Sequence, residues 1–323
     1  MGAETSSLMS GAGEPVASFP DYSLYTPDPG EDGEEDKTST FATSRYKPGC
    51  SLEKLADKLK QYRHPSILRF AAWRAGGGGA ALDTEWVLPL PLARAGAGAG
   101  EERALCLGLM EVCRALSFLH QAGVTHGNLT RAAVFVTATH RWRLGALDTA
   151  APATETGLAK DIQAFGLMVT EILAECELEA SVKFRDFAKN NLLLPDVRRL
   201  PSAENILQDP YFNQSFAKIF QFLVNFPVQS PEEKVDFFKT ATARLQQLPP
   251  ELVASHLVPL LLSRYVMMDP EAKQFLVPNL LVPRCPASAP PAGLSPILPA
   301  ALYADHLVPQ LRVLFSVPDT NIR

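Results

Sequence analysis

The sequence is poor in the residues that build disulfide frameworks, metal centres and membrane spans. It contains five cysteines and six histidines among 323 residues. The cysteine number is odd and no Cys-x-x-Cys pair occurs, which argues against a disulfide scaffold and a thiolate zinc site. The histidines lack the paired spacing of a metal motif. No apolar run approaches the roughly 18–20 residues of a transmembrane helix, and no basic-then-apolar leader begins the chain. We therefore expect reduced thiols, no metal and a cytosolic protein.

Basic residues are missing from the first 36 positions, which hold nine Asp and Glu. The whole chain has a net charge of −5, so the remainder carries a net charge of +4. Such a weakly charged body does not favour nucleic-acid binding, which usually depends on a strongly basic domain. The hydrophobic fraction of 46% is that of an ordinary globular protein, and the length suggests about two domains.

The first six residues, MGAETS, match the pattern for N-myristoylation of Gly2 after removal of Met1. So short a match can also arise by chance, and that alternative stays open. A single acyl chain gives only marginal, reversible membrane binding. The acids that follow would be repelled by anionic lipids. We expect Gly2 to be a lipid-attachment site that needs a further partner to hold the protein at a membrane.

Periodicity predicts a small strand-rich lobe followed by a helical lobe. Residues 1–40 are expected to be an acidic, largely irregular segment. The apolar patterns after it predict, in chain order, a strand at 41–47, a helix at 51–62, strands at 68–73 and 85–90, a helix at 101–120, strands at 134–136 and 142–144, and helices at about 161–176, 182–190 and 202–208. This order of elements is the layout of a protein kinase.

A kinase-like motif, His126-Gly127-Asn128-Leu129, follows the long helix. Kinases place His-Arg-Asp-Leu here, and the aspartate is the catalytic base. Asn128 occupies the base position, and a carboxamide cannot accept a proton at neutral pH. The position of the metal-binding asparagine falls on Ala133, which has no side-chain oxygen. The motif therefore predicts a structural role for His126 and no chemistry in the loop.

The nucleotide-binding positions are equally depleted. Ala146 stands where the metal-binding aspartate of Asp-Phe-Gly is expected, although a shifted register would let Asp148 serve instead. Lys47 fits the strand lysine that contacts phosphates, but its glutamate partner is replaced by Leu55. An exposed lysine at a strand end is an equally good interpretation of Lys47. No Gly-x-Gly-x-x-Gly precedes it. We therefore expect no cofactor, and ATP binding is doubtful.

Asp161 opens a motif, DIQAFG, that resembles the Asp-x-Trp-Ser-x-Gly start of a large kinase helix. There Asp161 would brace the backbone of the catalytic loop, a role that survives the loss of activity. Only a dozen residues separate Asp148 from Asp161, and no Ala-Pro-Glu is present. A working activation segment needs more, so we expect that the protein is not an enzyme.

The chain from residue 213 is predicted to be helical, and it repeats itself. The segment SHLVP at 255–259 recurs as DHLVP at 305–309, a period of fifty residues. An aspartate follows each histidine by thirteen residues, Asp269 in one copy and Asp319 in the other. This period, with its helix proline and turn aspartate, fits a HEAT-type solenoid, although two coincidentally similar helices would look alike. The chain stops where a second helix should begin, so we expect a fragment or shortened product.

A degenerate kinase domain followed by HEAT repeats resembles the Scy-like pseudokinase family, and the segments 230–239 and 248–262 add to the likeness. The resemblance implies an α+β bilobal kinase-like domain at 41–212 and an all-α HEAT-type solenoid at 213–323. It implies a catalytically inactive scaffold whose helical repeats bind proteins, ezrin and the trafficking machinery among them.

The resemblance also implies a peripheral location on Golgi-type membranes and at the cell's leading edge, with roles in trafficking, adhesion and migration. Two alternatives remain open. One is an atypical, weakly active kinase that uses Asp148 and Lys47. The other is a pure HEAT adaptor that is capped by a kinase-like remnant.

Overall fold

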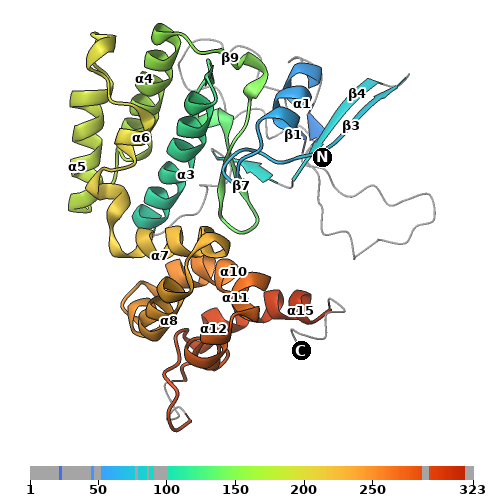
Figure 1. Cartoon of the computed structure of the whole chain (residues 1–323), viewed down its shortest axis with the longest axis vertical. Coiled ribbons are helices and arrows are strands. Elements are labelled where there is room, and N and C mark those ends of the chain that lie inside the picture. The colour runs from blue at the N-terminus through green and yellow to red at the C-terminus, as the bar shows by residue number, and fades with distance from the viewer. Residues whose placement is uncertain are drawn as a thin grey trace, which may run out of the picture.

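The computed structural model describes most of the chain from residue 52 onward. The described residues are 22–23, 45–46, 52–76, 79–85, 87–90, 101–285 and 291–316. Gly2 and Lys47 therefore lie outside the described residues. A part with mixed strands and helices precedes a purely helical part, and the two meet at helix α7, Ser215–Val224 (Figure 1).

The first sheet contains four antiparallel strands in the order β1-β2-β4-β3. Their bounds are Tyr22–Ser23, Arg45–Tyr46, Gly79–Thr84 and Phe70–Gly76. β1 falls within the segment that the sequence predicts to be irregular. Helix α1, Leu52–Gln61, packs against β3 and β4. Its buried side chains recur at helical spacing and are Leu52, Leu55, Ala56 and Leu59, which is why this predicted helix forms.

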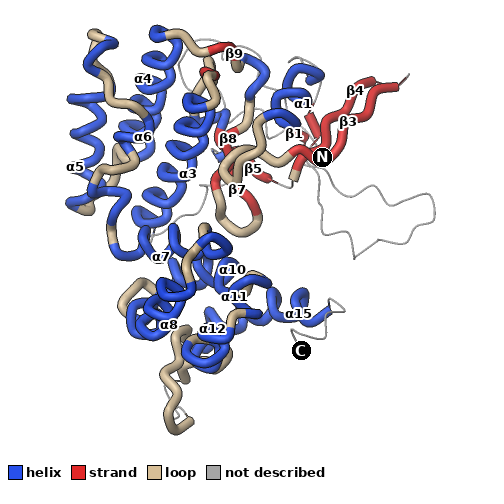
Figure 2. The backbone as a smooth tube through the Cα atoms, in the orientation of Figure 1, coloured by secondary structure: helices blue, strands red, loops and turns tan. Residues whose placement is uncertain are grey.

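Two smaller sheets lie between this sheet and the helices. One has the order β5-β7-β8, with bounds Val87–Pro89, Val134–Thr137 and Trp142–Leu144. The other pairs β6, Val124–Thr125, with β9, Ala151–Pro152. An isolated parallel bridge from Ile67 to Leu144 connects the turn after α1 to β8. Figure 2 shows the strands gathered on one side of the upper part and the long helices on the other.

The helices beside these sheets are α3, Glu101–Gln121, and α4, Glu155–Ile172. Helix α5, Glu179–Phe187, runs into a π-helical turn at Ala188–Leu192, and α6 is a single turn at Ala203–Ile206. α4 begins earlier than the predicted 161, because the Thr154 side chain accepts the N–H of Gly157 and caps the helix there.

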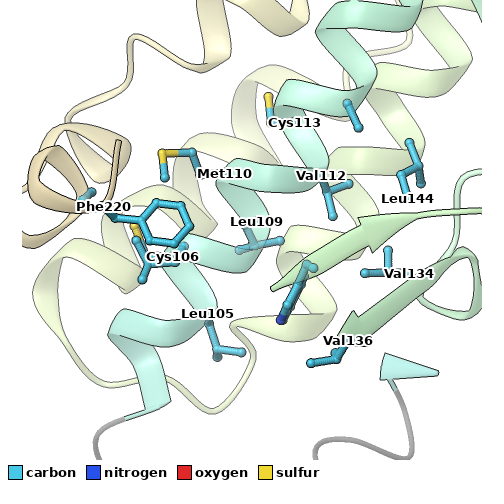
Figure 3. Packing of buried hydrophobic residues seen from close by; sticks show 14 of the residues in the cluster. Leu105, Cys106, Leu109, Met110, Val112, Cys113, Val134, Val136, Leu144 and Phe220 are labelled. Carbon is cyan, nitrogen blue, oxygen red and sulfur yellow. The ribbon is translucent and has the colours of Figure 1, made fainter. Parts of the chain in front are cut away.

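Helix α3 joins the two parts of the chain through two apolar faces. Its side chains Leu105 and Val112 are directed toward β7 and β8, whereas Cys106 and Met110 pack beside Phe220 of α7 (Figure 3). All of these side chains are buried in one continuous cluster. The absence of a Cβ at Gly108 admits the Trp142 ring, since a Cβ would meet that ring at 2.2 Å.

The helical part continues with α8, Pro231–Gln246, whose N-terminus carries a capping box between Ser230 and Glu233. The helices that follow are short, with bounds Pro250–Leu252 (α9), Val258–Leu261 (α10), Arg264–Met268 (α11), Pro270–Phe275 (α12), Val277–Leu280 (α13), Ala300–Leu302 (α14) and Val308–Ser316 (α15). None of the helices in the described part of the chain is long and apolar enough to cross a bilayer.

Both copies of the repeated motif have the same local structure. Each forms a π-helical turn, Val253–Leu257 in the first and Tyr303–Leu307 in the second. In each, the valine that follows donates its N–H five residues back, and a proline comes next. A proline lacks the N–H and clashes with the carbonyl four residues earlier, so a wider turn at this point relieves the helix. Asp269 caps α12 by accepting the N–H groups of Glu271 and Ala272. The HEAT-type solenoid stays a prediction, and Asp319 lies outside the described residues.

Candidate functional site

Asp161 of α4 lies at the centre of a buried hydrogen-bond cluster at the start of the loop after β6. Its Oδ2 accepts the N–H of His126 at 2.7 Å, and its Oδ1 accepts the N–H of Gly127 at 2.9 Å. The Nε2 of His120 lies 3.1 Å from Oδ2. Burial by itself would raise the pKa of Asp161, but these hydrogen bonds outweigh it and hold the pKa below its usual value. The carboxylate fixes the direction of the backbone at this point.

The His126 side chain connects the same loop to the end of β8. The ring is buried, with its Nε2 2.8 Å from the carbonyl of Gly145 and its Nδ1 accepting the N–H of Asn128 at 3.3 Å. Nδ1 is therefore an acceptor and Nε2 carries the hydrogen. Burial lowers the pKa of His126, so the ring is neutral.

Gly127 and Thr149 complete the cluster, and sequence reasoning missed the roles of both. Gly127 has a φ of +79°. The Thr149 hydroxyl donates to the carbonyl of His126 at 2.9 Å. A Cβ at position 127 would lie 3.0 Å from the Thr149 carbonyl oxygen. The position that holds arginine in kinases is therefore built for glycine, and the glycine in His126-Gly127-Asn128 is the signal that could have shown it.

The three positions where catalytic groups are expected lie around this cluster. The Asn128 side chain is exposed, and Ala133 is fully buried. The carbonyl of Ala133 accepts the N–H of Gly145 at 2.8 Å, so Ala133 and Ala146 lie on adjoining segments. Ala146 is buried with a φ of +53°. Two methyl groups and one amide offer neither a general base nor a carboxylate ligand for magnesium.

The surroundings add no metal ligands. Asp148, the alternative ligand, lies in a short 3-10 turn at Leu147–Thr149 and is partly exposed. Within the described ranges, no group of three or more His, Cys, Asp or Glu side chains could hold a metal ion.

Leu55 is the residue that the sequence predicts to replace the glutamate that pairs with the phosphate-contacting lysine in kinases. Its side chain is completely buried, and α1 packs against the turn at Leu147–Thr149. An apolar contact thus stands where an ion pair would hold the helix. The nearby acid Asp57 is exposed and lies 3.5 Å from Lys60 at the surface.

The segment that would bind a peptide substrate is very short. β9 ends at Pro152 and pairs with β6, and α4 begins at Glu155. Only Ala153 and Thr154 connect them, and Thr154 is already the helix cap. The chain leaves no room here for a substrate-binding platform.

Comparisons with known proteins find relatives of similar sequence, among them a mouse protein. The chain is 30% identical over 311 residues to the Mus musculus protein-associating with the carboxyl-terminal domain of ezrin. The alignment covers 84% of this chain and 42% of that protein, so the chain spans less than half the length of this relative. No family model matches the chain.

Among the solved structures that resemble parts of the chain are two of kinases. One is a divergent kinase lacking the glycine-rich loop, which regulates membrane ultrastructure of the Toxoplasma parasitophorous vacuole. It has a TM-score of 0.43 and 18% identity, over 50% of this chain and 64% of that one. The other is the Rad53 kinase domain with SCD2, with a TM-score of 0.44 and 17% identity, over 55% of this chain and 82% of that one. The sequence relationship confirms the resemblance that the motifs predict: over most of its length, this chain is a relative of a Scy-like family protein.

Proposed function

We propose that this chain is a catalytically inactive, kinase-like adaptor that brings other proteins together. The observation that carries the proposal is a contrast within one site. The cluster around Asp161 is complete, whereas Asn128, Ala133 and Ala146 offer neither a base nor a metal ligand. A fold that is kept without its chemistry is suited to binding rather than to phosphoryl transfer.

The test is a phosphate-transfer assay of the whole chain beside a calorimetric titration with Mg-ATP. The proposal expects no incorporation of labelled phosphate and no heat of nucleotide binding. An active kinase in the same buffer serves as the positive control. Phosphate incorporation that disappears in the Lys47→Ala or Asp148→Asn variant would instead establish a weakly active, atypical kinase.

Membrane association through Gly2 is a second part of the proposal. The MGAETS start supports an N-terminal myristoyl group, which would bring the protein reversibly to Golgi-type membranes and to the leading edge. Mass spectrometry of the mature N-terminus is the direct measurement. A retained, unmodified Met1 would contradict this part, and Gly2→Ala should move the protein from the membrane fraction to the supernatant.

Partner binding is assigned to the helical part, residues 213–323, which we propose to be HEAT-like, after a segment at 1–40 and a pseudokinase domain at 41–212. The name of the mouse relative makes the carboxyl-terminal domain of ezrin the first partner to assay. Tyr265 is 65% exposed on the helical part, and Leu178 is 39% exposed on the kinase-like part. Tyr265→Ser should weaken the capture of ezrin and Leu178→Ser should not. Equal effects of the two substitutions would contradict the assignment.

A further inference from the structure

A half-open cavity of about 320 Å³ lies where the turn after α1, the C-terminal third of α3 and the end of α7 meet. Its apolar wall is formed by Pro65, Phe118, Leu207 and Val224. Its polar wall is formed by His64, Ser66, Arg114, Ser117, Gln121 and Asn225. The lining therefore holds one permanent positive charge and several neutral donors, and it contains no Asp or Glu. The kinase-like chemistry discussed above uses none of these residues.

Arg114 is the charged group in this wall, and it is partly buried. In the part of the chain that the structure describes, its guanidinium has no hydrogen-bond acceptor or ion-pair partner within bonding distance. The nearest acid on the same helix is Glu111, and its carboxylate is already engaged. It binds Arg141, lies 3.5 Å from Arg143 and accepts the N–H of Trp142 at 2.8 Å. Since a guanidinium stays charged in proteins, a partly desolvated one without an acceptor favours an incoming anion.

His64 is fixed as a neutral donor beside Arg114. Its ring stacks on Phe118 with the centroids 5.0 Å apart, and its Nδ1 accepts the N–H of Ser66 at 3.1 Å. Nε2 therefore carries the hydrogen. Burial, followed by the charges of Arg114 and Arg143, lowers the pKa of His64 to about 4, so the ring adds no charge at neutral pH.

The remaining donors are partly preorganised. The Gln121 amide lies 3.5 Å from the Ser117 hydroxyl and 3.5 Å from the exposed carboxylate of Glu204. Glu204 is not part of the cavity wall, but its contact with Gln121 places a negative charge beside that wall residue. The site thus offers one guanidinium fork, with hydroxyl and amide donors around it. The negative charge of Glu204 opposes the binding of any anion, and it opposes a dianion about twice as strongly as a monoanion.

We propose that this cavity binds a single carboxylate group of a partner peptide. A planar guanidinium matches a carboxylate with two parallel hydrogen bonds. The single positive charge of Arg114 neutralises the single negative charge of a carboxylate. A phosphate dianion would keep one uncompensated negative charge, which the carboxylate of Glu204 would repel. The carboxylate can come from an acidic side chain or from a peptide C-terminus. The inference rests on the proposed adaptor function, since it supplies that adaptor with a peptide-binding site.

The experiment follows the arginine Nε–Hε resonances of the whole chain by NMR, with the Arg114 signal assigned through its loss in the Arg114→Lys variant. Four probes are titrated separately. They are Ac-Ala-Glu-Ala-amide, Ac-Ala-Gln-Ala with a free C-terminus, Ac-Ala-Gln-Ala-amide and inorganic phosphate. The proposal expects a saturable shift of the Arg114 signal with one or both carboxylate peptides and none with the neutral peptide. The first two probes distinguish the side-chain source from the C-terminal source.

Arg114→Gln should weaken the binding of the responding peptide about tenfold or more, and Ser117→Ala should weaken it less. Binding by these variants is read from the peptide signals. Arg103→Gln on the same helix lies outside the cavity and should leave binding unchanged. Arg114→Lys keeps the charge without the fork and covers the case in which Arg114→Gln does not fold.

Three results would overturn the proposal: no shift with either carboxylate peptide, equal binding by the Arg114→Gln chain, or tighter binding of phosphate than of carboxylate. These results are separate from a failure of the adaptor function. Phosphate transfer in the kinase assay would reject the inactive adaptor but would leave the carboxylate titration to be judged by itself.

Discussion

Asp161, which we call the loop anchor, differs from Ala133 and Ala146 at the predicted catalytic positions in what its side chain contributes to the stability of the fold. Asp161 accepts two backbone N–H groups, the buried one of His126 and the partly buried one of Gly127. Ala133 and Ala146 are methyl groups in a packed cluster, and they leave no polar atom unsatisfied. Replacing a metal-binding side chain by alanine changes the stability of the fold little. Removing the Asp161 carboxylate leaves the N–H groups of His126 and Gly127 without an acceptor, which lowers the stability. A contribution to stability is enough to retain Asp161, whether or not the positions beside it support catalysis.

The strongest test of this difference is Asp161→Ala. The substitution removes the acceptor of His126 and Gly127 and the partner of His120, so we expect a loss of about 3–5 kcal/mol in the free energy of unfolding. Urea titration followed by circular dichroism measures it. Asn128→Ala on the exposed side of the same loop is the matched control and should change the free energy by about 0.5 kcal/mol or less. Similar losses in both variants would remove the distinction.

A smaller effect is expected from a pair of glycines in the same region. Gly127 and Gly123 both have positive φ values, +79° and +71°. A Cβ at 127 would press on the Thr149 carbonyl, whereas a Cβ at 123 would meet nothing within 4 Å. Gly123→Ala should cost about 1 kcal/mol for the left-handed backbone alone. Gly127→Ala should cost more, by about 1 kcal/mol. Equal unfolding midpoints for the two variants would show that the Thr149 contact does not constrain the loop.

The pH dependence of the free energy of unfolding tests the burial of His126, whose N–H is bound by Asp161. Folding lowers the pKa of His126 from its ordinary value of 6.5, because the ring is buried. The unfolded chain therefore binds a proton that the folded chain excludes. The contribution of the buried, neutral His126 ring to the free energy of unfolding is fully present above pH 6.5 and is lost progressively as the pH falls below that value. We expect the urea concentration at the unfolding midpoint to decrease as the pH is lowered from neutral to about pH 5. The plot of this midpoint against pH should have a shallower slope in His126→Gln. His306→Gln controls for loss of a histidine elsewhere, and an unchanged slope in His126→Gln would contradict the assignment.

The smallest effect is expected from substitutions that restore two of the kinase residues at the predicted catalytic positions. Asn128→Asp places a carboxylate at the base position, and Ala133→Asn restores an oxygen at the metal position. Because Ala146 and Leu55 are unchanged, the double variant should transfer no measurable phosphate in an assay with labelled ATP. Asn128→Asp alone should alter stability by about 0.5 kcal/mol or less. Transfer by the double variant would mean that the other positions matter less than the geometry indicates.

The sequence predicted those elements whose apolar residues have a clear period. Helices α1 and α3 lie within one or two residues of their predicted bounds, since each buries a regular stripe of leucines or small apolar residues. The start of α4 was wrong because the Thr154 cap was overlooked. The π-helical turns at 253–257 and 303–307 were not predicted, since the proline pattern signals a disturbed helix without saying how the chain relieves it.

The site was predicted only in part, for a similar reason. Motif spacing was enough to single out His126 and Asp161 as neighbours. The contribution of Gly127 depends on its positive φ. Those of Thr149 and His120 depend on tertiary contacts, including the pairing of β6 with β9, between residues that are 23 and 41 positions apart in the sequence. No local pattern in the sequence encodes such a long-range register.

The two-residue passage from β9 to α4 has a consequence for how this protein can be controlled. Protein kinases are turned on and off by a phosphate on the loop at this place, which swings between two positions. Ala153 and Thr154 are too short a connection to swing, and Thr154 is already committed to the start of a helix. This connection therefore lacks the loop through which phosphorylation activates a protein kinase. In the proposed adaptor, regulation would instead follow from which binding partners are present and at what concentration.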